Sequence, residues 1–176
     1  MLSLWGDTWH LERGGAVKDA HSLAGIVEGC GKSGKGILGA ALCLRSPPVY
    51  LDDAWETARA YRLRIIEATR QAHPLPDNPL IYEIADADAV SGVADAVSFD
   101  GLLNHPPVAV MAPRGDSYSV SARSPQGAGK DLAAILSDLA GTCGGTGGGH
   151  YSRGGAKIPP RDKIDCFTSG FLEVCA

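Results

Sequence analysis

The chain has 176 residues, which is enough to bury a hydrophobic core and fits one compact body or a domain with a helical extension. A hydrophobic content of 44% with 20% charged residues is ordinary for a globular protein and excludes an intrinsically disordered chain. The net charge of -4 excludes a protein held on nucleic acid by a strongly positive overall field, so any such contact is expected to be local, weak or shared with a partner.

The first half of the chain has the apolar spacing of helices. It predicts a helix over residues 17–27 with a glycine stop at Gly29 to Gly31, a buried helix or strand over 37–44, and the longest helix over 51–72. Four arginines of that helix are predicted to lie on a solvated face: Arg59, Arg62, Arg64 and Arg70. The prolines of residues 73–79 favour a linker or sharp crossover over any regular element. We therefore predict a helical segment over residues 1–73 and a second domain over 80–176.

A first glycine cluster, from Gly25 to Lys35, includes Gly31-Lys32-Ser33 and superficially matches a phosphate loop for nucleoside triphosphates. The spacing of its glycines does not fit that motif, and the preceding segment is predicted to be helical rather than a strand. The cluster is interpreted as a connection between two helices.

The second half interleaves short strands and helices. The pattern predicts strands over 80–84, 108–112, 118–122 and 156–158, with helices over 93–103, 130–139 and 163–174. The strands 108–112 and 118–122 are expected to form a hairpin around Gly115-Asp116. The predicted fold class is α/β, an N-terminal helical segment followed by a small mixed α/β domain with a glycine-rich turn.

The glycine-rich turn, residues 144–149, is followed at once by His150 and then by Arg153. Glycines let the backbone approach a ligand closely and expose N–H groups to an anion. An imidazole and a guanidinium add charge-assisted donors for the same anion. A flexible surface turn with an incidental histidine is the alternative. The strand that precedes it by some twenty residues carries Arg123, and this favours an anion-binding site.

These residues resemble the DHH-associated domain that follows the catalytic domain of RecJ nucleases and oligoribonuclease-type phosphoesterases. The resemblance rests on residues 120–124, the helix from Lys130, the Gly-Gly-Gly-His segment 147–150 and the segment 154–158. It implies that Arg123 and His150 contact the phosphates of a single-stranded substrate and that glycines give backbone access. The full set expected to bind nucleic acid is Ser121, Arg123, Gly147, Gly148, Gly149, His150 and Arg153.

A narrower resemblance covers the first half. Residues 20–32, 37–39 and 58–62 are similar to the helical segment between the two domains of archaeal RecJ-like proteins. That resemblance implies association with the GINS complex and the replicative helicase.

The catalytic Asp-His-His segment of that family has no counterpart here. The acidic cluster Asp86 to Asp88, with Glu83 nearby, has no histidine close in sequence, so no metal site, no cofactor and no hydrolysis by this chain are expected. The leading hypothesis is a non-catalytic RecJ-like subunit that binds single-stranded nucleic acid and scaffolds a DNA replication assembly. A second is the C-terminal half of a split or truncated exonuclease whose DHH domain lies on another chain. A third is binding of a small nucleotide or tRNA end.

The cysteines form an odd set of five without CxxC spacing, and Cys30 and Cys143 are expected to be buried, unreactive thiols. The first residues lack the basic and apolar regions of a signal peptide, and no apolar run approaches the roughly 18 residues of a membrane span. A cytoplasmic protein without membrane insertion is predicted.

Overall fold

The computed structural model describes residues 10–11, 17–44, 48–98, 106–125, 128–159 and 163–176. The chain divides into two compact units, residues 1–64 and 65–176. The division falls within the long helix α3 (Leu51–Gln71), whereas the sequence suggested a boundary after it.

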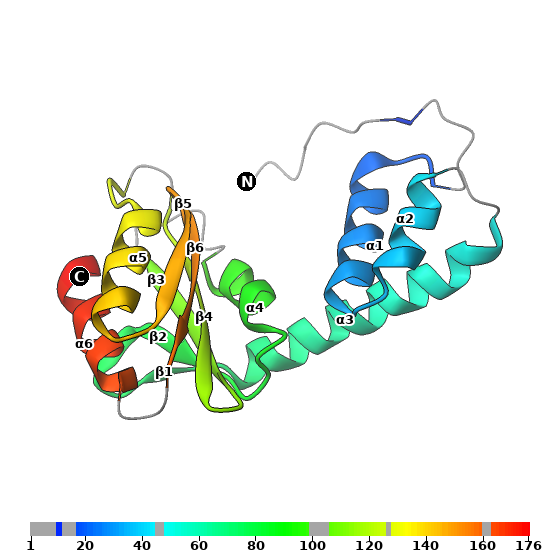
Figure 1. The fold of residues 1–176 in the computed structure, drawn as a ribbon. Helices are drawn as coiled ribbons and strands as arrows, with labels where there is room; N and C mark the ends of the chain where they lie inside the picture. The colour runs from blue at the N-terminus through cyan, green and yellow to red at the C-terminus, as the bar shows by residue number, and fades with distance from the viewer. Residues whose placement is uncertain (1–9, 12–16, 45–47, 99–105, 126–127, 160–162) are drawn as a thin grey trace, which may run out of the picture. The chain divides into compact units, whose positions relative to one another are not determined.

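The first unit contains α1 (Ala20–Lys32), α2 (Gly36–Cys43), the short 3₁₀ helix η1 (Pro48–Tyr50) and the beginning of α3 (Figure 1). The Asp19 carboxylate caps α1 by accepting a hydrogen bond from the Ser22 N–H at 2.7 Å. Hydrogen bonding from Ser22 lowers the pKa of Asp19. A small core joins the three helices and consists of Ile26, Cys30, Leu42, Ala54 and Ala58.

The predicted glycine stop of the first helix is wrong, because α1 continues through Gly29 and Gly31 to Lys32. A Cβ atom on Gly29 would lie 2.7 Å from the Ala58 Cα atom, so this glycine lets α1 and α3 pack backbone to backbone. The positive φ that ends the segment belongs to Gly34 instead.

The second unit is built on a six-stranded mixed sheet. In spatial order the strands are β1 (His73–Leu75), β2 (Asn78–Glu83), β3 (Val108–Arg114), β4 (Ser117–Arg123), β6 (Arg153–Ile158) and β5 (Thr146–His150). β2 and β3 are parallel, and all other neighbouring pairs are antiparallel. The predicted mixed α/β fold class is confirmed.

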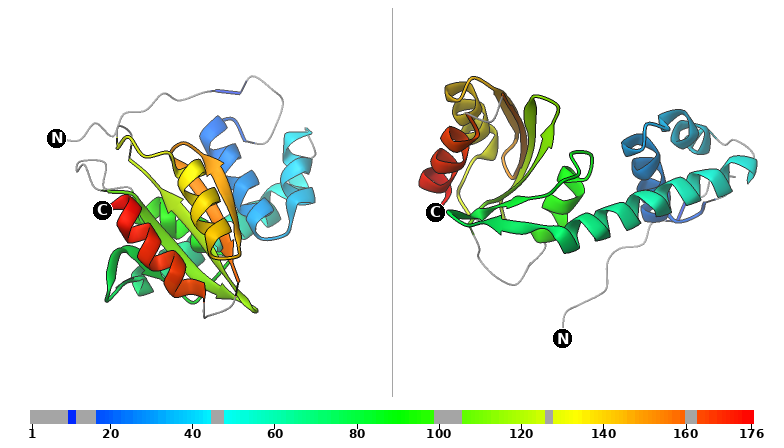
Figure 2. Two further views of the ribbon diagram at one scale, coloured as in Figure 1. Left: turned by 60° about the vertical axis from the view of Figure 1, so that its left-hand side comes forward. Right: turned by 90° about the horizontal axis from the view of Figure 1, so that it is seen from below.

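Helices cover the sheet on both faces (Figures 1 and 2). Helix α4 (Val90–Val97) packs on β3 and β4 from one side, and α5 (Leu132–Thr142) packs on β5 and β6 from the other, beside α6 (Ile164–Cys175). The core on the α5–α6 side includes Leu136, Ile158, Phe167 and Phe171, all fully buried. Residues 99–103 of the predicted helix over 93–103 lie outside the described residues.

Two predicted irregular segments form strands instead. The proline-rich segment 73–79 contains β1 and the start of β2, paired as a hairpin, so its assignment as a linker or crossover is wrong. Pro74 fits because β1 is an edge strand, where a missing N–H costs no ladder hydrogen bond. Likewise, most of the predicted glycine turn is strand β5, and only Gly144 and Gly145 lie in the turn before it.

The cysteines are only partly as expected. Cys30 is a buried thiol whose Sγ atom lies 3.7 Å from the Ala54 carbonyl oxygen, and burial raises its pKa. Cys143, however, forms a disulfide with Cys166 that links the end of α5 to α6, so the prediction of a free thiol there is wrong.

Candidate nucleic-acid interface

The hairpin of β5 and β6 presents one polar face to solvent. Along β6 the exposed residues alternate with residues that turn toward the core, as a strand with one covered face requires. The antiparallel register sets the residues of β5 directly opposite them on the same face. We call this surface the open face, and it consists of Thr146, Gly148, His150, Arg153, Gly155 and Lys157.

Helix packing explains why this face stays uncovered. α4 lies against β3 and β4, whereas α5 covers β5 and β6 on the opposite face. A Cβ atom built on Gly148 would meet no atom within 4 Å, and one on Gly155 would have the Val120 carbonyl oxygen as its nearest neighbour, at 3.3 Å. The floor of the open face is therefore bare backbone, accessible to a ligand.

The edge position of β5 adds hydrogen-bonding groups. β5 is the last strand of the sheet, so alternate backbone N–H and C=O groups along it have no strand partner. Backbone N–H groups at a sheet edge are potential hydrogen-bond donors for an anion.

Arg123 lies beside the open face, on β4, directly opposite Arg153 in the register. Its side chain is buried, and all three guanidinium nitrogens donate to protein atoms. Nε donates to the Asp95 carboxylate at 2.7 Å, Nη1 to the Ser121 hydroxyl at 2.8 Å and the Ala122 carbonyl at 3.0 Å, and Nη2 to the carbonyl and hydroxyl of Ser91 at 3.2 Å each. In this structure Arg123 joins α4 to the sheet, and its direct contact with an anion stays a prediction.

Asp95 on α4 connects the two arginines. The same carboxylate oxygen accepts from Arg123 Nε at 2.7 Å and from Arg153 Nη2 at 2.8 Å. The Arg123 side chain is 9% exposed and that of Arg153 is 62% exposed. Arg153 is thus held at the surface with most of its side chain open to solvent.

Sequence reasoning missed Asp95 and Ser91. These residues are four apart on α4 and so share one face of that helix. Two polar residues on a short, largely apolar helix were the available signal, because such residues need a partner wherever that helix packs.

The structure divides the predicted binding residues into two groups. Ser121, Arg123, Gly148, His150 and Arg153 share one side of the sheet. Gly147 and Gly149 alternate with Gly148 and belong to the other side. A Cβ atom on Gly147 would lie 2.3 Å from the Leu136 carbonyl oxygen of α5, so this glycine serves helix packing.

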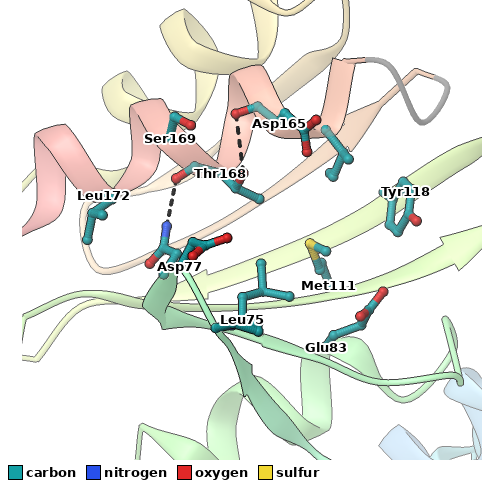
Figure 3. A pocket seen from close by; sticks show the side chains of 12 residues that line it. Leu75, Asp77, Glu83, Met111, Tyr118, Asp165, Thr168, Ser169 and Leu172 are labelled. Atoms are coloured by element: carbon teal, nitrogen blue, oxygen red, sulfur yellow. Dashed lines mark hydrogen bonds between the residues drawn. The ribbon is translucent and has the colours of Figure 1, made fainter.

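Apart from the open face, the structure has a cavity of about 390 Å³ between the β1–β2 hairpin and α6. Figure 3 shows Leu75, Met111 and Leu172 around it together with three carboxylic acids. Those acids are Asp77, Glu83 and Asp165. Carboxylates repel a phosphate backbone, so electrostatics favour the open face over this cavity as a nucleic-acid site.

Among the described residues, no group of three or more His, Cys, Asp or Glu side chains is arranged to hold a metal ion. In the acidic cluster Asp86 to Asp88, considered from the sequence as a metal site, Asp88 forms an ion pair with Arg114. No helix in the described ranges has the length and apolar character to cross a membrane.

A protein-family model described as the DHHA1 domain matches residues 77–175, more than half of the chain. The chain belongs to the DHHA1 domain family. The matched part runs from the turn between β1 and β2 to the last residues of α6, so the DHHA1 domain contains the whole open face and its supporting residues Arg123 and Asp95.

Two solved structures that are similar to this chain have low sequence identity to it. A chain described as the DHH domain of a member of a family of ribosomal proteins is 17% identical, with a TM-score of 0.55 over 88% of this chain and 42% of that chain. The C-Ala domain of alanyl-tRNA synthetase from Aquifex aeolicus is 14% identical, with a TM-score of 0.45 over 53% of this chain and 85% of that domain. Comparison with curated protein sequences finds no match.

Proposed function

We propose that this DHHA1-domain protein binds single-stranded nucleic acid on the open face of β5 and β6, as a non-catalytic, RecJ-like subunit. The observation that carries the proposal is the exposed row of His150, Arg153 and Lys157 above a floor of bare glycine backbone. Cationic side chains and free backbone N–H groups are complementary to phosphates.

The shape of the open face favours a single strand over a duplex. The floor is one hairpin wide, and none of the helices that the structure describes stands on it to enter a groove. Tyr151, at the tip of the hairpin, is 58% exposed beside His150, and an exposed aromatic ring is a stacking surface for an unpaired base.

The acidic net charge sets the expected affinity. With a net charge of -4, the molecule has no general attraction for nucleic acid, so a few local contacts carry the binding. Weak binding by one chain suits a subunit that works inside a larger assembly. On the family resemblance, that assembly is a replication complex with GINS or the replicative helicase as protein partner.

The proposal includes a cytoplasmic location. It rests on the five cysteines, which form an odd set without CxxC spacing, as is typical of proteins in a reducing compartment. The Cys143–Cys166 disulfide argues against it, since disulfides are rare in reducing compartments.

The second candidate is the C-terminal part of a RecJ-like exonuclease or phosphoesterase whose metal-binding DHH domain lies on another chain. The likeness to a DHH-domain structure of which this chain spans only 42% favours it. Here the open face would hold the substrate strand while another domain performs the hydrolysis. Metal-dependent cleavage that appears only when a DHH-domain protein is added would support this candidate.

The test is fluorescence anisotropy of a labelled single-stranded oligonucleotide with the purified full chain, at two salt concentrations, with and without manganese. The wild type is expected to bind more weakly at the higher salt and to leave the strand intact. The double variant His150→Ala/Arg153→Ala is expected to lose at least about tenfold in affinity, because it removes two charge-assisted contacts.

The matched control is His73→Ala/Arg70→Ala, which removes the same two side-chain types from exposed positions outside the open face. Equal loss in both double variants, or no binding by the wild type, would overturn the binding proposal. Cleavage of the strand by the chain alone would overturn its non-catalytic part.

A further inference from the structure

A second basic position lies at the far end of the hairpin from His150 and Arg153. There the β3–β4 hairpin and the loop that enters β5 enclose a cleft of about 620 Å³. Its lining includes Arg114, Ser117, Gly144, Gly145, Thr146 and Lys157. Since Thr146 and Lys157 also belong to the open face, the cleft adjoins that face.

Lys157 is the cation that faces this cleft most freely. It stands opposite Thr146 on one neighbouring strand and Ser119 on the other, so its side chain projects on the same side of the sheet as Arg153. Within the described part of the chain, Lys157 has neither an ion pair nor a hydrogen bond from its side chain. An exposed ammonium group without a carboxylate partner is available to an incoming anion.

The other groups of the cleft assist or oppose it. The N–H groups of Gly144 and Gly145 already donate to carbonyls of α5, so an anion there would be held by side chains. Arg114 is shared with Asp88, and Thr146 adds an exposed hydroxyl. Asp116, at the tip of the β3–β4 hairpin, places one carboxylate in the lining and weakens the local positive potential.

We infer that this cleft is a second phosphate subsite, so that one nucleic-acid strand lies along β6 from Arg153 to Lys157. The inference rests on the proposed function and specifies its ligand. The two cations are four residues apart along a strand that rises about 3.3 Å per residue, which separates their Cα atoms by about 13 Å. A stacked strand advances about 3.4 Å per nucleotide, so the ligand is an oligonucleotide of about four nucleotides rather than a mononucleotide.

The test uses competition by unlabelled oligodeoxythymidylates of about two to eight nucleotides against a labelled longer strand. Wild-type affinity is expected to rise with length until both subsites are filled. Lys157→Ala is expected to remove that gain: it lowers affinity about tenfold for long competitors and leaves the shortest one unchanged. It should also reduce the salt dependence by about one phosphate contact, a slope of about 0.7.

Two further variants separate charge from structure. Asp116→Asn is expected to raise the affinity for long competitors, because it removes the opposing carboxylate from the same cleft. Lys163→Ala removes an exposed lysine at the start of α6 and is expected to change nothing.

The outcomes separate the inference from the proposed function. If His150→Ala/Arg153→Ala weakens binding but Lys157→Ala acts equally at every length or not at all, the second subsite is overturned and the proposed function stands. If the wild type binds no oligonucleotide, both are overturned. A length-dependent loss in Lys157→Ala with the opposite change in Asp116→Asn supports the subsite.

Discussion

The two sides of the β5–β6 hairpin share one glycine-rich sequence and use it differently. On the side of α5, a Cβ atom at Gly147 would lie 2.3 Å from the Leu136 carbonyl oxygen, and one at Gly154 would lie 2.4 Å from the Leu136 Cδ1 atom. On the open face, Gly148 has no atom within 4 Å of that position. Because strand residues alternate between faces, glycines of one hairpin serve close helix packing at Gly147 and Gly154 and leave the backbone accessible at Gly148.

The largest expected effect comes from a matched pair of glycine substitutions. Gly147→Ala is expected to lower the free energy of unfolding by about 3 kcal/mol, because the methyl group would overlap the backbone of α5. Gly148→Ala meets open space and is expected to raise it by about 0.5 kcal/mol, because alanine restricts the unfolded chain. Urea unfolding followed by circular dichroism measures both, and equal midpoints would abolish the distinction between the two sides.

Arg123 and Arg153, which both pair with Asp95, allow the buried and the exposed side of the same ion-pair network to be compared. Arg123→Met is expected to lower the free energy of unfolding by about 2 kcal/mol, because it leaves the polar groups of Ser91 and Ser121 without their buried donor. Arg153→Ala, at the exposed end of the same carboxylate, is expected to cost less than about 1 kcal/mol.

Oligonucleotide affinity is expected to respond in the opposite order for these two arginines. Arg153→Ala should weaken binding by about tenfold while the protein stays folded. Should Arg123→Met fold normally and lose binding as strongly as Arg153→Ala, Arg123 would be a direct phosphate contact rather than a residue that supports the interface. Denaturation and anisotropy on the same preparations decide between these roles.

Local sequence predicted the elements whose evidence is local. The periodicity of α3, α5 and α6 and the turn at Gly115 of the β3–β4 hairpin, which has a positive φ of 57°, are visible within short windows. β5 was not predicted, because glycine has a low strand propensity and this strand depends on pairing with β6 and contact with α5. β1 was not predicted either, because its Pro74 is tolerated only at the edge of a sheet, and local sequence does not show which strand lies at the edge.

The candidate site shows the same division. The predictions of an anionic ligand and of binding residues around the hairpin came from composition and from the resemblance to DHH-associated domains, and they stay predictions. The residues that hold Arg123 and Arg153 in place could not be predicted in this way. Asp95 lies 28 residues from Arg123 in sequence, and no local pattern connects them. Which face each glycine serves likewise follows from the sheet register, which one residue of shift would reverse.

A further expected effect is a pH dependence of stability that arises on the side of the sheet covered by α5 and α6. Burial raises the pKa of the Cys175 thiol to about 11, although the charge of Lys130 opposes the shift. A raised pKa means that the folded state retains the proton longer than the unfolded chain does, so this contribution to stability is complete below about pH 9 and is lost as pH rises toward about 11. Cys175→Ala should therefore reduce the loss of stability between about pH 9 and about pH 11, measured as the urea midpoint. Cys43→Ala, which removes an exposed thiol, should leave that loss unchanged. Identical pH profiles for wild type and Cys175→Ala would show that this thiol does not couple the packed side to pH.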